Sequence, residues 1–305
     1  MRVLIVGMGV QGIKRKSFCK SEFIGFVDPI NNKANWKDIN EVPLNIYDAI
    51  LACIPDKPKE ELIRFCIKNN KHILVEKPLF MNKTKIEELI KDVHNSSIIC
   101  YPAYNHRFEP HFVNLKKLIR SNKLGKIYSC RMFYGNGTAR LVKQSQWRDK
   151  GSGVLSDLGS HLLDTCNFWF GNNSNNDNWQ MVSSNNFENV ALDHAVILNQ
   201  SNHLRIELEM TMLMWKNHFT CDILAEKGSA HIVSLCKWGP SKLIIRKRTL
   251  PSGIPKENQS ILIQDDPTWK LEYEFFKNLI NKKQNINLDW QIELNDILTN
   301  LSSGI

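Results

Sequence analysis

The stretch Arg2-Val-Leu-Ile-Val-Gly-Met-Gly-Val-Gln-Gly12 decides the fold of this chain. It begins with a continuous apolar run, which predicts a strand buried on both faces of a parallel sheet. Gly7, Gly9 and Gly12 then form a GxGxxG pattern. The first glycine allows a tight turn, the second lets the backbone approach a pyrophosphate, and the third lets a helix pack closely on the strand. We therefore expect a dinucleotide-binding strand, turn and helix.

An acidic residue follows the second predicted strand. The run Phe23-Ile-Gly-Phe-Val27 ends in Asp28. A carboxylate at this position accepts hydrogen bonds from both hydroxyls of the adenosine ribose and repels a 2′-phosphate, so Asp28 favours NAD over NADP. The nearby Asn31-Asn32-Lys33 segment leaves NADP as the alternative.

The rest of the first half alternates apolar strands with amphipathic helices, which is typical of a doubly wound parallel sheet. Strands are predicted at 48–55, 71–76 and 97–101, and helices at 59–68, 84–94 and 112–120. Ligands of such sheets bind at the carboxyl ends of the strands. Glu76-Lys77-Pro78 lies at such an end, although Lys77 also fits a loop lysine in water. The predicted cofactor contacts are Gly7, Gly9, Val10, Gln11, Gly12, Asp28, Cys53, Ile54, Pro55, Glu76 and Lys77.

A second informative stretch is Gly151-Ser-Gly-Val-Leu-Ser-Asp-Leu-Gly-Ser-His-Leu-Leu-Asp164. Its leucine spacing predicts a helix that ends at Gly171. Asp157, His161 and Asp164 recur at helical spacing and share one face. A histidine beside a carboxylate suits proton transfer near neutral pH. The same residues also fit a solvated ion pair on a surface helix.

The second half predicts a sheet followed by two helices. Strands are expected at 125–134, 195–198, 204–212, 219–225, 230–235 and 242–248, and helices at 269–280 and 289–301. Residues 204–212 alternate apolar with polar side chains, as a sheet with one buried face requires. We therefore predict an α/β chain with a Rossmann domain at 1–122 and an α+β domain at 123–305. The last helices of the second domain could pack back on the first domain.

Composition narrows the class of protein. The 305 residues are 42% hydrophobic and 23% charged, an ordinary globular profile, and no apolar run is long enough to span a bilayer. The N-terminus lacks the apolar core and cleavage site of a signal peptide, so a cytoplasmic location is expected. Eight scattered cysteines without metal-ligand spacing predict reduced thiols and no metal site.

The net charge of +9 suits an anionic small-molecule ligand. Because the basic residues are dispersed and no nucleic-acid motif accompanies them, we do not expect nucleic acid as a partner.

The order of the motifs resembles one family. GxGxxG at 7–12, Asp28, Glu-Lys-Pro at 76–78, Asn-x-Arg-Phe at 105–108 and Gly-x-Gly with Asp-x-x-x-His at 151–161 are similar to the Gfo/Idh/MocA oxidoreductases. The resemblance implies hydride transfer between NAD(P) and a secondary alcohol or ketone of a sugar, cyclitol or sugar nucleotide. It makes His161 the general acid/base, Asp157 the residue that orients the hydroxyl, and Lys77 a contact of nicotinamide ribose and substrate. A homodimer or homotetramer through the second sheet is also implied.

Other residues are assigned more loosely. We predict substrate contacts for Tyr104, Asn105, Arg107, Trp147 and Arg148, while Trp147 and Arg148 also fit a packed tryptophan beside a surface arginine. Asp164 is expected to be structural. Two other functions stay open, namely a hydrolase or lyase that retains NAD and oxidises its substrate transiently, and a non-catalytic nucleotide-binding protein.

Overall fold

The computed structural model describes residues 1–145, 148–171, 178–200 and 204–303. The chain divides into two compact units. The first contains Met1–Asn105 and Thr268–Asn295, and the second contains His106–Pro267 and Asp296–Ile305. A helix near the end of the chain, α7 (Thr268–Lys282), therefore belongs to the first unit, and α8 (Asp289–Ser302) is shared. The division into domains at residues 122 and 123 stays a prediction.

A five-stranded parallel sheet forms the first unit, with the order β2-β1-β3-β4-β5. Its strands are β1 (Val3–Val6), β2 (Phe23–Val27), β3 (Ala49–Ala52), β4 (His72–Glu76) and β5 (Cys100–Ala103). Its helices include α1 (Val10–Cys19), α2 (Lys59–Lys68) and α3 (Lys83–His94). This is the predicted Rossmann arrangement.

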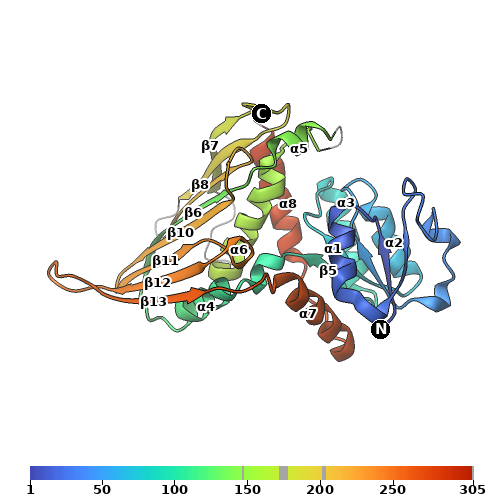
Figure 1. Cartoon of the computed structure of the whole chain (residues 1–305), viewed down its shortest axis with the longest axis horizontal. Coiled ribbons are helices and arrows are strands. Elements are labelled where there is room, and N and C mark those ends of the chain that lie inside the picture. The colour runs from blue at the N-terminus through green and yellow to red at the C-terminus, as the bar shows by residue number, and fades with distance from the viewer. Residues whose placement is uncertain (146–147, 172–177, 201–203, 304–305) are drawn as a thin grey trace. The chain divides into compact units, whose positions relative to one another are not determined.

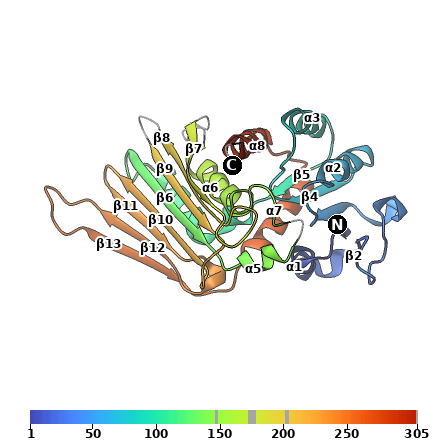
Figure 2. The same cartoon turned by 90° about the horizontal axis from the view of Figure 1, so that it is seen from above.

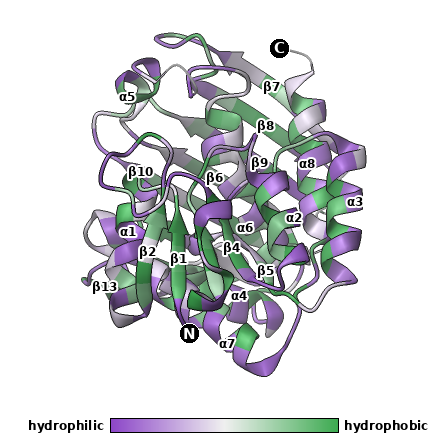
Figure 3. Cartoon of the chain, turned by 90° about the vertical axis from the view of Figure 1, so that its right-hand side faces the viewer, coloured by the Kyte–Doolittle hydropathy of each residue, from purple (hydrophilic) through white to green (hydrophobic). Residues whose placement is uncertain are grey.

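The central strands are apolar because both faces of the sheet are covered. Every residue of β1 and β3 is buried, and Figure 3 shows the apolar colour of the strands beside the mixed colouring of the helices. On α2 the buried residues include Leu62, Ile63 and Cys66, which recur at helical spacing. The sheet and the apolar stripes of its helices thus share one core.

The second unit is built on an eight-stranded sheet with the order β13-β12-β11-β10-β6-β9-β8-β7. Its neighbouring strands are antiparallel except for the parallel pair β6 and β9. The strands are β6 (Ile127–Gly135), β7 (Trp179–Asn185), β8 (His194–Gln200), β9 (Arg205–Thr211), β10 (His218–Ala225), β11 (Gly228–Val233), β12 (Ser241–Lys247) and β13 (Lys256–Leu262). The prediction of a large, mainly antiparallel sheet is confirmed.

Helices pack on one face of this sheet. They are α4 (Pro110–Arg120) and α6 (Ser160–Phe170), and α6 lies over the sheet in Figures 1 and 2. The contact is close, because a Cβ atom at Gly159 would lie 2.8 Å from the sulfur of Met210 on β9. On the other face, β9 presents charged residues such as Glu207, which pairs with Arg131 at 3.1 Å. A short helix, α5 (Ala139–Lys143), lies at the end of β9, where the N–H of Ala139 donates to the Met212 carbonyl.

Some predicted elements differ from those observed. Strand β5 begins at Cys100 rather than at residue 97, because the N–H of Ile99 donates to the side-chain ring of His72 on β4 instead of to a backbone carbonyl. Strand β13 is not predicted, because its sequence does not alternate apolar with polar residues. It is exposed along almost its whole length and pairs with β12 through its backbone. Polar edge strands of this kind are determined by pairing rather than by burial.

Two further expectations concern cysteines and membranes. All eight cysteines are free thiols, and seven of them are buried. Within the described part of the chain, none of the helices combines the length and the apolar character that crossing a bilayer requires.

Candidate active site

The glycine loop leaves space at the start of α1. Gly7 has φ +87°, and a Cβ atom there would collide with the Cys53 carbonyl, so a side chain is excluded. A Cβ atom at Gly12 would collide with the Gly7 carbonyl. At Gly9, by contrast, a Cβ atom would meet nothing within 4 Å, and this N-cap residue of α1 has no side-chain cap. The first amides of α1 are therefore available to an anionic group.

Asp28 fastens the glycine loop to the end of β2. One carboxylate oxygen accepts from the Met8 N–H at 2.9 Å, and the other accepts from the N–H groups of Ile30 and Asn31 at 3.0 Å. Burial disfavours the charged form, but these three backbone donors outweigh it and lower the pKa of Asp28. The loop thus carries a fixed negative charge at neutral pH.

Buried cations hold the Glu76-Lys77-Pro78 turn at both ends. Arg15 of α1, with 2% of its side chain exposed, lies 2.8 Å from the Glu76 carboxylate and 2.8 Å from that of Glu272 on α7. Lys59 of α2, equally buried, donates to the Pro78 carbonyl at 2.8 Å. The half-buried Lys77 lies between these anchors in the sequence.

These residues fit a dinucleotide cofactor. The open space at Gly9, the uncapped start of α1 and the Asp28 carboxylate are the features that receive a pyrophosphate and an adenosine ribose. Val10 and Gln11 are exposed in the first turn of α1, and Cys53, Ile54 and Pro55 follow β3 directly. All the predicted cofactor contacts therefore lie in the first unit, at or beside the carboxyl ends of its strands.

In the second unit, a π-helical turn precedes α6. The turn spans Leu155–Gly159 and contains Asp157, while His161 lies in the first turn of α6. The predicted regular α-helix is therefore wrong for this part, since an i→i+5 turn has a wider spacing than an α-helix. Arg148 lies 3.5 Å from the Asp157 carboxylate, and both side chains are about one third exposed. Turns of this kind are frequent at functional sites.

A short segment before α4 contacts α6 at two positions. The imidazole of His106 stacks on that of His161, with ring centroids 4.1 Å apart and planes 23° apart. Arg107 binds the buried Asp164 with two hydrogen bonds, from Nε at 2.8 Å and from Nη2 at 2.5 Å. Asp164 thus has the structural setting expected for it, and Arg107, predicted to bind substrate, is engaged by this carboxylate.

A lysine of the second unit lies in the same region. Lys237 follows β11 in the 3₁₀ turn Cys236–Trp238, and its Nζ lies 3.2 Å from the phenol oxygen of Tyr134. The Tyr134 ring is 5.4 Å from that of His106 and 6.3 Å from that of His161. Burial lowers the pKa of Lys237, against the opposing charges of Asp266, Glu109 and Asp157. Lys237 therefore belongs to the electrostatic surroundings of Asp157.

The remaining predicted substrate contacts have varied settings. Tyr104 is buried with 1% exposed, and the Asn105 amide donates to the Thr268 hydroxyl at 2.8 Å. Arg148 pairs with Asp157, as described above. Trp147 lies outside the described residues. The roles of these residues in substrate binding stay predictions.

The sequence did not single out Lys59, His106, Tyr134 or Lys237. The basic run 14–16 suggests a solvated face, which is wrong for Arg15, because its side chain is buried between two carboxylates. His106 lies within the polar and aromatic segment 104–110, so the composition of that segment was a usable signal. Lys237 had no such signal, because a lone lysine after a strand is normally solvated. Its position depends on the register that brings β11 and β6 alongside β10.

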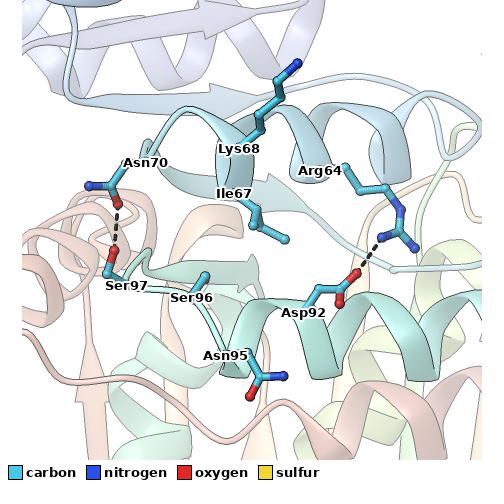
Figure 4. Close-up of a pocket in the computed structure, with 8 residues that line it drawn as sticks. All are labelled: Arg64, Ile67, Lys68, Asn70, Asp92, Asn95, Ser96 and Ser97. Carbon is cyan, nitrogen blue, oxygen red and sulfur yellow. Dashed lines mark hydrogen bonds and ion pairs between the residues drawn. The ribbon is translucent and has the colours of Figure 1, made fainter.

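A pocket of about 700 Å³ lies elsewhere in the first unit (Figure 4). Its lining comes from the ends of α2 and α3 and the turns that follow them, and it includes the Arg64–Asp92 ion pair at 2.6 Å. These turns lead into the amino ends of β4 and β5, at the opposite edge of the sheet from the glycine loop. The pocket is therefore separate from the carboxyl ends of the strands, where the predicted cofactor contacts lie.

Comparison with known families matches both halves of the chain. A model described as an oxidoreductase family with an NAD-binding Rossmann fold (GFO_IDH_MocA) matches residues 1–104. A model of the GFO/IDH/MocA C-terminal domain matches residues 112–231. The matched ranges contain Lys77, Asp157 and His161.

Individual relatives are more distant. A trans-1,2-dihydrobenzene-1,2-diol dehydrogenase of Xenopus laevis is 22% identical over 73% of this chain and 66% of its own length. A myo-inositol 2-dehydrogenase of Thermotoga maritima is 31% identical over 28% of this chain and 25% of its own length. A structure of levoglucosan dehydrogenase with NADH is 16% identical, covers 100% of this chain and 97% of its own, and has a TM-score of 0.83, which shows a shared fold.

Proposed function

Because the chain belongs to the Gfo/Idh/MocA oxidoreductase family, we propose that it transfers hydride between NAD and a secondary alcohol or ketone of a sugar or cyclitol. The observation that carries the proposal is the open, uncapped start of α1 at Gly9, next to the ionised Asp28. Both features suit NAD, whose nicotinamide supplies the hydride acceptor or donor when it is bound.

In the first unit, the proposed roles follow from charge. The amides of α1 and the glycine loop bind the pyrophosphate, and Asp28 accepts hydrogen bonds from the adenosine ribose. The negative charge of Asp28 supports NAD rather than NADP, because it would repel a 2′-phosphate. Lys77 stabilises negative charge that develops on the reacting oxygen, which is the role of an ammonium group at an alkoxide.

In the second unit, the proposed roles of His161 and Asp157 follow from the proton transfer that must accompany hydride transfer. A carbon gives up hydride only as its hydroxyl loses a proton, so a base must be held beside that hydroxyl. His161 is the proposed base in oxidation and the acid in reduction. Asp157 orients the hydroxyl, and Arg148 and Lys237 offset its negative charge.

The substrate class rests on the relatives and on charge. The two curated relatives are named for a cyclitol and for a ring-shaped diol, and the structural neighbour for levoglucosan. We therefore infer a ring-shaped polyol as the substrate. Because the net charge of +9 attracts anions, acidic and phosphorylated sugars are among the first compounds to test.

The test starts with the cofactor. Calorimetric titration should show NAD(H) binding more tightly than NADP(H). A screen of cyclitols, sugars and sugar phosphates should then identify one that changes the NADH absorbance in steady turnover. Lys77→Met and His161→Ala should each lower kcat by about 10²-fold or more, in keeping with the loss of an acid/base or charge-stabilising group.

Matched controls are available on α3. Lys91 and His94 are exposed there, so Lys91→Met and His94→Ala should leave turnover unchanged. Full turnover in both site variants would overturn the assigned roles. Tight NAD binding with substrate consumption but no net NADH would instead favour the NAD-retaining hydrolase or lyase. Dinucleotide binding without turnover of any screened compound would favour the non-catalytic nucleotide-binding alternative.

A further inference from the structure

One short segment holds the helix that carries His161. His106 stacks on His161, and the next residue, Arg107, forms a paired hydrogen bond with Asp164. His161 and Asp164 are one helical turn apart on α6. The two contacts therefore act on the same face of α6, and the first of them acts directly on the imidazole.

The supporting ring is itself fixed by packing. Only 3% of His106 is exposed. Its ring meets the edge of Phe112 at a centroid distance of 6.0 Å and lies 5.4 Å from Tyr134. Phe112 in turn packs on Trp169 and Phe219, at 5.0 and 5.2 Å. His106 thus belongs to a buried aromatic cluster that reaches into the core of the second unit.

An imidazole needs such support because its own torsion is weakly restrained. The rotation of a histidine ring about the Cβ–Cγ bond has broad, roughly two-fold minima. A general base has to be held within about 0.5 Å and 10–20° of its working geometry. A face-to-face neighbour restrains the plane of the ring, and it does not occupy the in-plane directions in which the ring nitrogens bond.

We propose that His106 is a positioning residue, which sets the plane of the His161 imidazole for proton transfer. The proposal rests on the assigned acid/base role of His161 and names a second residue on which that role depends. The flat face of His106 performs this task, and its ring nitrogens are not required. A phenylalanine should therefore replace His106, whereas a branched aliphatic side chain should not.

The experiment compares His106→Phe with His106→Leu. Both variants remove the ring nitrogens and fill the buried site, but only phenylalanine keeps a flat face. With a substrate found in the screen, His106→Leu should lower kcat by about 10–100-fold with little change in KM, because misplacing a catalytic group costs rate rather than binding. His106→Phe should stay within about threefold of wild type. The deuterium isotope effect on kcat should rise only in His106→Leu.

Several outcomes would overturn the proposal. A folded His106→Phe that loses as much kcat as His106→Leu would show that the nitrogens matter. An unchanged kcat in His106→Leu, with His161→Ala inactive, would refute the role of His106 alone. Full activity of His161→Ala would instead remove the proposed function itself.

A crystal structure of His106→Leu tests the same point without substrate. The His161 ring should be rotated or poorly ordered there, and an unchanged, well-ordered ring plane would contradict the proposal. Melting temperatures establish that the variants are folded. His94→Phe and His94→Leu, on the exposed face of α3, serve as matched controls and should be indistinguishable.

Discussion

The buried ammonium of Lys59 donates a 2.8 Å hydrogen bond to the carbonyl oxygen of Pro78. This bond anchors one end of the turn that carries Lys77, and the Arg15–Glu76 ion pair anchors the other. Neither cation belongs to the recognised motif. The position of Lys77 therefore depends on residues of α1 and α2 that the motif does not include.

Lys59→Met should loosen this turn. The substitution keeps the volume but leaves the buried Pro78 carbonyl without its donor, which costs about 1–3 kcal/mol of unfolding free energy. We also expect kcat to fall by about tenfold, because Lys77 loses its restraint. Urea unfolding and steady-state kinetics measure the two effects, with Lys57→Met, at the exposed lysine just before α2, as the control. An unchanged kcat in the destabilised variant would show that Lys77 is held without Lys59.

Asp28 should make the stability of the protein depend on pH in the acid range. Its pKa is lowered in the folded state, so its contribution is complete above the unfolded value of about 3.9 and is lost as pH falls through the folded pKa. Asp28→Asn should therefore have a lower free energy of unfolding than wild type at neutral pH, and the two values should converge below about pH 3. Urea unfolding at stepped pH measures this. A difference that stays constant down to pH 2 would show that the Asp28 charge adds nothing.

Arg15→Met should be among the most destabilising single changes in the first unit. It leaves two carboxylates, of which Glu272 is fully buried, without their cation. Loss of one partner of a buried ion pair costs about 3–5 kcal/mol. Adding Glu272→Met should recover about 1–3 kcal/mol, because the two sites are coupled. Denaturant midpoints of both variants, with exposed Lys16→Met as the control, test this. Additive losses would argue against the coupling.

The sequence predicted the parallel sheet well because its signals are local. The apolar run before Gly7, the glycine spacing and Asp28 each follow from neighbouring residues. The π-helical turn at Asp157 could not be predicted in this way, because its leucine spacing resembles that of an α-helix. Strand β13 was missed for a related reason, since an exposed strand needs no apolar alternation.

The sequence predicts the motif residues of the candidate site, but it does not predict the residues that contact them and hold them in place. Lys77, Asp157 and His161 are identified by the resemblance, whereas the contact of His106 with His161 joins residues far apart in the chain. Arg107 shows the same limit. The polar segment around it predicts a substrate contact, which stays a prediction, and its partner Asp164 becomes visible only when α6 is packed.

Lys237 and Tyr134 should act on turnover as one unit. The Lys237 ammonium lies 3.2 Å from the Tyr134 phenol, whose ring borders both His106 and His161. Lys237→Met and Tyr134→Phe should each lower kcat/KM by about tenfold, through loss of one charge-assisted hydrogen bond. The double variant should be no slower than either single variant, because the second change removes a bond already broken. Exposed Lys256→Met is the control, and multiplicative losses would mean that Lys237 acts on Asp157 independently of the phenol.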